Sequence, residues 1–389
     1  MDPAREGEIL QSMARYDWWE HRDRRSEPPA VIPENFSSTG YAVAVPAQSV
    51  ASPTAYTLLA GRLLSWMPRL TIVDDLYVLR SLSAIFGMLT LWVAWLGARE
   101  CLGTMGGATV TALLALHPQF AVVATAAAAD ALVNLLGACV WWQTAVAVRR
   151  RDRFLPLAGV WGAAIAAASA DRMGVPLLAL ALIASIVVLA TRIERFTRSA
   201  AAVFVLLALA AAAWALGAAG ETYGLASAFT GDWLPVPEAR SWDFWGRFTS
   251  FVHQSWWFSL GWVRYAPPSW WVAVATTLTA LAAAGTGRQL ISARPLDVQR
   301  RNLVALAVLG VGLQVAAVYW TYFRLGHGAQ GKSLFPVLIP SLVLLWGGIE
   351  TWVPTPLRAH AAAALVVLLA LLDAAVWGLV AIPAYYASF

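Results

Sequence analysis

The sequence predicts an all-α fold: a polytopic transmembrane helical bundle of about ten spans, with extracytoplasmic loops and one interfacial amphipathic helix. Of 389 residues, 59% are hydrophobic and 13% are charged, whereas soluble domains carry about 25% charged residues. Apolar runs of about 20 residues, long enough to cross roughly 30 Å of hydrocarbon, recur along most of the chain. A single water-soluble core cannot bury that much apolar surface, so we expect the membrane to be the solvent.

Ten apolar segments account for the predicted spans. They are residues 79–98, 108–124, 127–148, 155–170, 174–191, 200–219, 270–285, 303–323, 334–352 and 361–382. His117 and Pro118 lie inside the second segment. Because a proline removes a backbone donor, we expect a kink or a pair of half-helices there.

Arginine-rich loops set the predicted topology. Residues 149–153, 192–198 and 288–301 each carry several arginines, and positive charge close to membrane ends marks the cytoplasmic side. One orientation places these three loops inside and puts residues 1–78 and the loop 324–333 outside. The net charge of +5 is therefore interpreted as topogenic, and no nucleic-acid partner is expected.

The topology divides the chain into four regions. These are the extracytoplasmic residues 1–78, a first set of spans in 79–219, an extracytoplasmic tryptophan-rich segment at 220–268 and a second set of spans in 269–389. Residues 1–78 contain neither a signal peptide nor an apolar stretch that would carry them across. We therefore expect a further transmembrane helix to precede Met1. The alternative is a cytoplasmic N-terminus with one of the ten spans miscounted.

The tryptophan-rich segment contains the predicted interfacial helix, at about Ser241 to Trp262. Helical spacing relates its large apolar residues, which are Trp242, Trp245, Phe248, Val252 and Trp256. Tryptophan favours the headgroup level of a membrane, so these rings are interpreted as anchors, with a carbohydrate-stacking platform as the alternative. Trp256 and Trp257 are the candidates for contacting a sugar.

A glycine-rich loop at 326–333 matches the P-loop pattern, ending in Lys332 and Ser333. A P-loop joins a buried strand to a soluble helix, whereas this loop lies between two predicted spans on the outer side, so nucleotide hydrolysis is not expected. The composition still suits an anion, because glycines let backbone N–H groups approach it. The candidate substrate-binding residues here are Arg324, His327, Gln330 and Lys332, of which Arg324 and Lys332 supply positive charge for a phosphate. A flexible turn with snorkelling basic side chains is the alternative.

Acidic residues near the outer face are few. Asp130 and Asn134 lie four residues apart at the start of a span and share one helical face, so they are predicted to bind substrate, with helix capping by Asp130 as the alternative. Asp171 adjoins Arg172, which favours a local ion pair. Glu6 and Glu8 precede an amphipathic stretch, and either is a candidate general base. The cysteines, Cys101 and Cys139, have no metal-ligand spacing, so no metal residues are assigned.

Four stretches carry a resemblance to a known family. They are Ser52–Tyr56, similar to its "PPLYY" turn; Leu79–Gly87, similar to "RLLSxxxG"; Asp130–Leu136, similar to "NDALxNLL"; and Gln330–Pro336, similar to "QGRYLFP". The chain thereby resembles a family of bacterial polytopic membrane proteins of unknown function, itself similar to the C-type glycosyltransferases that use polyprenyl-phosphate sugars. The likeness covers nearly the whole chain in order. Lys332 stands in place of the family's arginine and lacks its bidentate fork.

The resemblance implies a C-type glycosyltransferase fold in the bacterial inner membrane and transfer of a sugar from a polyprenyl-phosphate donor to a glycan or lipid acceptor. It further implies an acidic base in the first external loop, matched by Glu6 and then Glu8, and is compatible with a divalent metal. Arg324 and Lys332 would neutralise the leaving phosphate. Two other hypotheses remain: a transporter or flippase of lipid-linked saccharides, and a non-catalytic membrane protein that retains the fold.

Overall fold

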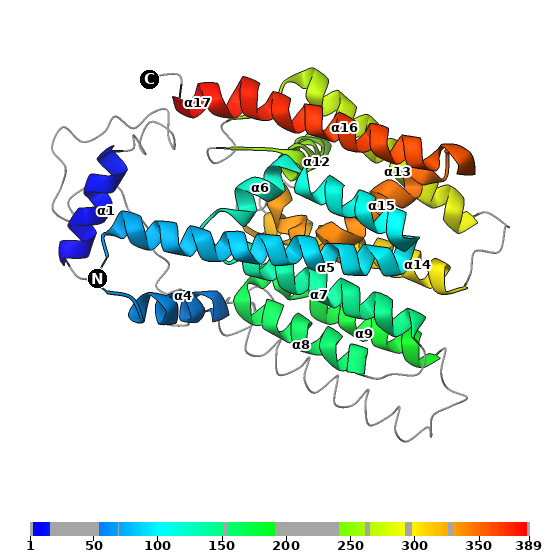
Figure 1. The fold of residues 1–389 in the computed structure, drawn as a ribbon, viewed down its shortest axis with the longest axis horizontal. Helices are drawn as coiled ribbons and strands as arrows, with labels where there is room; N and C mark the ends of the chain where they lie inside the picture. The colour runs from blue at the N-terminus through cyan, green and yellow to red at the C-terminus, as the bar shows by residue number, and fades with distance from the viewer. Residues whose placement is uncertain are drawn as a thin grey trace.

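The computed structural model describes residues 3–15, 54–68, 70–150, 155–190, 241–260, 265–291, 298–325 and 330–386. Within these ranges every regular element is a helix, and the β structure they contain is one isolated bridge between Leu260 and Tyr265. Figure 1 shows the long helices packed side by side as a bundle, with α1 (Pro3–Arg15) and α4 (Ala55–Ser65) near the end where α5 begins. The predicted all-α class is confirmed.

Six segments in the described ranges are long and apolar enough to cross a membrane. They are Ile72–Ala115, Asp130–Arg149, Arg172–Ala190, Val298–Phe323, Gly331–Glu350 and Thr355–Ala384. Three of these segments are single helices: α5 (Ile72–Ala115), α7 (Asp130–Arg149) and α14 (Val298–Leu325). Two begin with a short 3-10 helix, namely η2 (Arg172–Gly174) before α9 (Pro176–Ala190) and η5 (Gly331–Val337) before α15 (Leu338–Glu350). The last consists of η6 (Thr355–Leu357), α16 (Arg358–Val376), the π-helix η7 (Trp377–Ala381) and α17 (Ile382–Tyr386). The chain is therefore a helical membrane protein, with fewer spanning helices in the described ranges than the ten predicted.

Part of that difference lies in α5, which is a helical hairpin. Gly103 within it has φ 76°, a left-handed conformation that glycine adopts readily. A Cβ on Gly107 would lie 3.0 Å from the backbone of Arg99, although residues eight apart on a straight helix are separated by about 12 Å. The chain therefore reverses at Gly103, and Figure 1 shows the second half of α5 returning toward α6 (Pro118–Ala124). The predicted span 79–98 and the first part of the predicted span 108–124, as far as Ala115, thus share one element.

Three other predicted spans explain the rest of the difference. α8 (Leu155–Ala170) is apolar but has 16 residues, which extend about 24 Å and fall short of the hydrocarbon thickness. α13 (Ser269–Ile291) is 23 residues long but carries threonines and a glutamine that lower its hydropathy. The segment 200–219 lies outside the described residues.

A break separates α5 from α6 (Pro118–Ala124). His117 is the N-cap of α6, and its Nδ1 atom accepts a hydrogen bond from the amide of Phe120 at 3.4 Å. Pro118 is the first helical residue, where a missing N–H donor costs nothing. The predicted discontinuity at His117 and Pro118 is confirmed, and it places a histidine inside the fold.

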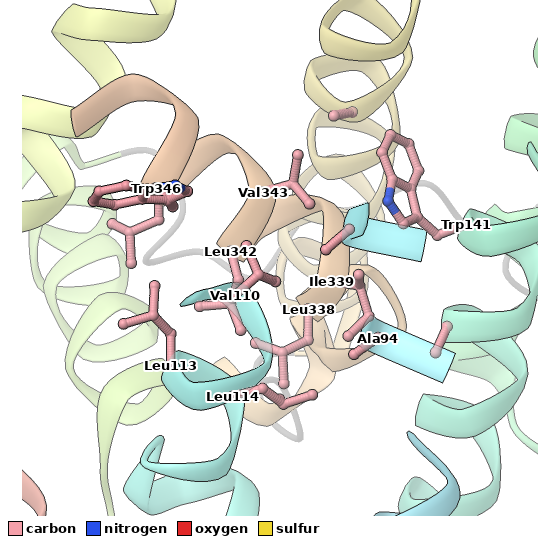
Figure 2. Packing of buried hydrophobic residues seen from close by; sticks show 14 of the residues in the cluster. Ala94, Val110, Leu113, Leu114, Trp141, Leu338, Ile339, Leu342, Val343 and Trp346 are labelled. Carbon is pink, nitrogen blue, oxygen red and sulfur yellow. The ribbon is translucent and has the colours of Figure 1, made fainter. Parts of the chain in front are cut away.

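The apolar core lies where α5, α7 and α15 meet. Figure 2 shows Leu113 and Leu114 of α5 close to Leu338 and Leu342 of α15; these side chains are buried. α15 also packs closely on α13, because a Cβ on Gly285 would collide with the carbonyl of Gly348. Apolar packing and close backbone approach together fix the helices that carry the polar residues described below.

One end of the bundle, the basic end, is defined by arginines beside the turn of α5 and at the ends of α7, α13, α14 and α16. They are Arg99, Arg149, Arg150, Arg288, Arg300, Arg301 and Arg358. Arg150 pairs with Glu100 at 3.5 Å, and Arg300 and Arg358 both pair with Glu350. Within the described ranges arginines outnumber carboxylates at this end, which is the end predicted to face the cytoplasm.

Candidate functional site

At the end opposite the basic end, Lys332 and Asp130 form an ion pair. The Nζ atom of Lys332, in η5, lies 3.1 Å from Oδ2 of Asp130, the first residue of α7. Both side chains are partly exposed, so ligands in solution can reach the pair. The N-cap of α7 is Ala129 and makes no side-chain cap bond, so the capping alternative for Asp130 is wrong. Its carboxylate is instead held by a residue 202 positions away.

Asp171 adds a second carboxyl group to this site. It is the N-cap of η2, and its Oδ1 atom accepts a hydrogen bond from the amide of Met173 at 2.8 Å. Burial raises the pKa of Asp171 above its usual value of 3.8; the Met173 bond opposes this shift, and the charge of Asp130 adds to it. Lys332 and Arg172 lie close enough to lower the pKa in turn. The predicted ion pair of Asp171 with Arg172 is replaced by a cap bond, since these two described side chains form no salt bridge.

Gln314 of α14 holds η2 and η5 together. Its Nε2 atom donates to the carbonyl of Met173 at 3.0 Å and to the carbonyl of Ser333 at 2.8 Å. The side chain is completely buried. Because Met173 is two residues from Asp171 and Ser333 adjoins Lys332, this glutamine sets the spacing of the charged groups. Sequence reasoning missed Gln314, although an amide within an apolar span is a signal for a structural or functional role.

The C-terminal part of α12 (Trp242–Trp257) closes the site from another side. The amide of Gly331 donates to Oγ of Ser255 at 2.8 Å. A Cβ on Gly331 would collide with the backbone of Trp256, so only glycine fits there. The amide of Ser259 donates to Oε1 of Gln119 at 2.7 Å, which ties the chain after α12 to α6.

His117 lies among aromatic rings beneath the site. Its ring stacks on Trp257 at 5.4 Å and meets Trp256 and Phe335 edge-on at 4.7 and 5.5 Å. Its Nε2 atom is buried and has no hydrogen-bond partner among the described residues. The aromatic contacts link α6, α12 and η5.

The predicted interfacial helix exists as α12. Trp242 at its start is 91% exposed, whereas Phe248 and Val252 are buried. Trp245 stacks on Tyr319 of α14 at 5.6 Å and on Phe323 at 6.1 Å. These ring faces are occupied by protein side chains. The arrangement favours anchoring and helix packing over a sugar platform at Trp245.

The structure brings together only some of the predicted site residues. Asp130 and Lys332 are in contact, and Gln330 is the N-cap of η5. Asn134 is buried, and its Nδ2 atom has no partner within the described residues. Trp256 is partly exposed, but Trp257 is 1% exposed and belongs to the core.

The remaining predicted residues lie elsewhere. Glu6 and Glu8 are on α1, which packs against α5; the Glu8 side chain is exposed. Arg324 is in the last turn of α14, and its side chain lies outside the described residues, as does His327 entirely. No group of three or more His, Cys, Asp or Glu side chains suited to a metal occurs in the described ranges.

The fold and site define a helical membrane protein with a lysine and two carboxyl groups gathered at one end of its bundle. No model of a known protein family matches the chain, and a search of curated proteins finds no significant match.

Proposed function

We propose that the chain is a membrane glycosyltransferase-like protein that transfers a sugar from a polyprenyl-phosphate donor to a glycan or lipid acceptor at the end opposite the basic end. The observation that carries the proposal is the partly exposed pair of Lys332 and Asp130 beside Asp171. In this site Lys332 provides a cation that can neutralise a phosphate leaving group, and the two aspartates provide carboxyl groups for proton transfer. The setting is that of a bacterial cell membrane, as the resemblance implies.

The proposed reaction assigns one role to each charged residue. Lys332 binds the donor phosphate and stabilises the negative charge that develops on it. Asp171 accepts the proton of the acceptor hydroxyl, for which a raised pKa suits a general base. The acceptor oxygen bonds to the sugar's anomeric carbon as the bond from that carbon to the phosphate oxygen breaks, and the phosphate leaves with the electron pair. Asp130 orients Lys332.

Asp171 replaces Glu6 and Glu8 in this proposal because of position. α1 packs against α5, whereas Asp171 lies within electrostatic reach of both Asp130 and Lys332. No divalent metal is required by these roles, and the described residues offer no cluster that would hold one by itself. A metal brought in by the donor phosphate is compatible with the two carboxylates.

Sugar transfer in reconstituted vesicles tests the proposal. We expect Lys332→Gln to lower turnover about 10²–10³-fold, the scale of a lost charge-stabilising donor, and Asp171→Asn to lower it comparably. Glu8→Gln and Arg247→Gln are the matched controls, since both positions are exposed and outside the site. If Asp171→Asn retained turnover and Glu8→Gln lost it, the general base would be Glu8 on α1 and not Asp171. Unchanged turnover in Lys332→Gln would refute the phosphate site.

A second candidate, a transporter or flippase of lipid-linked saccharides, is favoured by one observation. Two discontinuous helical segments meet: the break at His117 before α6, and η5 with Pro336 before α15, with the rings of His117 and Phe335 5.5 Å apart. Facing broken helices are typical of transporter binding sites. Movement of the intact lipid-linked sugar across vesicles, unaffected by Asp171→Asn, would support this function instead. Donor binding with neither activity would support a non-catalytic protein that retains the fold.

A further inference from the structure

The basic end contains a charge cluster that the proposed sugar transfer does not use. Glu350, at the end of α15, is 9% exposed and receives two arginines from different helices. Nη2 of Arg300, from α14, lies 3.3 Å from its Oε2 atom, and Nη1 of Arg358, from α16, lies 3.2 Å from its Oε1 atom. One carboxylate thus holds two guanidinium groups, and the cluster keeps a net positive charge.

The cluster has more donors than acceptors. Each guanidinium carries several N–H donors and no acceptor. Within the described residues, the buried Nε atoms of Arg300 and Arg358 have no partner, and neither does that of Arg149 nearby. The two contacts to Glu350 are also longer than the 2.7–2.9 Å typical of charge-assisted bonds. The Arg300 and Arg358 side chains are also partly exposed, so guanidinium donors that Glu350 does not use are accessible to a further anion with several oxygens.

Apolar and aromatic side chains flank the cluster at the membrane boundary. Arg288 lies over the ring of Trp352, 5.1 Å from its centroid, and Trp352 follows Glu350 by two residues. Trp352 and Leu357, which precedes Arg358, are both exposed. Tryptophan and arginine at a helix end are suited to the headgroup level. An anion bound here would have apolar surface beside it, as a phospholipid requires and a free phosphate does not.

We infer that the cluster of Arg300, Arg358 and Glu350 is a binding site for the phosphate of an anionic phospholipid in the leaflet at the basic end. Basic sites between transmembrane helices on the cytoplasmic side bind anionic headgroups. The two guanidinium groups bind the phosphate in competition with Glu350, and Trp352 and Leu357 contact the glycerol and the upper acyl chains. The lipid thereby joins α14, α15 and α16. This site is separate from the proposed sugar transfer.

Purified full-length protein in neutral detergent gives the test. Melting temperature and lipid retention, the latter by native mass spectrometry, are measured with phosphatidylglycerol and with phosphatidylcholine at the same mole fraction. We expect phosphatidylglycerol alone to raise the melting temperature of the wild type and to remain bound. Arg358→Gln should lose most of that rise, whereas Arg247→Gln, an exposed arginine outside the cluster, should keep it. Arg358→Lys retains the positive charge but lacks the planar guanidinium that binds a phosphate through two hydrogen bonds, so this variant should bind phosphatidylglycerol more weakly than wild type.

Glu350→Gln separates a lipid site from a purely structural ion pair. Removing the competing carboxylate should tighten phosphatidylglycerol binding by about threefold or more, even where the variant melts lower in phosphatidylcholine. A structural pair predicts lower melting temperatures for Glu350→Gln and Arg358→Gln with the phosphatidylglycerol rise unchanged, which would overturn the inference. An equal rise with inorganic phosphate at matched concentration would assign the site to a free anion and equally overturn it.

Discussion

Lys332 in η5 and Asp130 at the start of α7, 202 residues apart in sequence, are held 3.1 Å apart at the end of the bundle opposite the arginines. Asp171 lies close enough for its carboxyl to sense both charges. Apolar helices position all three groups, since η5 packs on α7 through the contact of Pro336 with Gly137. The arrangement gives a scaffold of apolar helices a small polar site.

The pair of Lys332 and Asp130 is expected to contribute little to stability. Both side chains are partly exposed, and exposed ion pairs contribute about 1 kcal/mol or less. A double-mutant cycle with Lys332→Gln and Asp130→Asn, followed by the free energy of unfolding, should therefore give a coupling energy in that range. A coupling of several kcal/mol would make the pair a structural element and weaken its assignment to ligand binding.

The stability of the wild type should depend on pH through Asp171. Burial raises the folded-state pKa of this carboxyl above the unfolded value near 3.8, so the folded protein binds the proton more tightly. Its contribution to stability is complete below pH 3.8 and is lost as pH rises through the folded pKa.

Asp171→Asn tests this dependence because asparagine keeps an acceptor for the Met173 amide. The melting temperature of Asp171→Asn relative to wild type should increase from pH 4 upward and then level off. A difference that stays constant with pH would show that the Asp171 carboxyl is not perturbed.

Gln314 should be required for the local fold. Gln314→Leu removes the donor to the carbonyls of Met173 and Ser333, and each buried carbonyl left without a partner costs about 1–3 kcal/mol. With two such carbonyls, we expect a loss of about 2–6 kcal/mol in the free energy of unfolding. Gln11→Leu, at an exposed position of α1, is the control. A change below 1 kcal/mol for Gln314→Leu would mean that neither bond matters.

Gly331 and Gly246 form a matched pair for testing the approach of η5 to α12. Alanine at Gly331 would place a Cβ against the backbone of Trp256, whereas nothing lies within 4 Å of a Cβ at Gly246. Gly246→Ala, inside α12, should be neutral or stabilising by up to about 1 kcal/mol. Gly331→Ala should lower the melting temperature and, under the proposed function, donor turnover. Equal effects at both positions would show that the close approach does not occur.

Periodicity and composition predicted the helical class, the break at His117 and the amphipathic helix α12, because each depends on local residue pattern. The reversal at Gly103 also agrees with the sequence prediction, because the separate spans 79–98 and 108–124 require the chain to turn back between them. The bond between Asp130 and Lys332 was hidden: both residues were candidates, but their contact depends on how α7 packs against η5. Gln314 and Asp171 gained their roles from burial, which no short motif encodes.

Photocrosslinking tests the central claim most directly. A polyprenyl phosphate with a photoreactive group next to the phosphate is irradiated with the reconstituted full-length protein, and the modified peptides are mapped by mass spectrometry. Binding at the proposed site predicts labelling of η5 and of the first turn of α7, with the labelling lost in Lys332→Gln and retained in Glu8→Gln. Labelling confined to the basic end, or unchanged by Lys332→Gln, would contradict a donor site at Lys332.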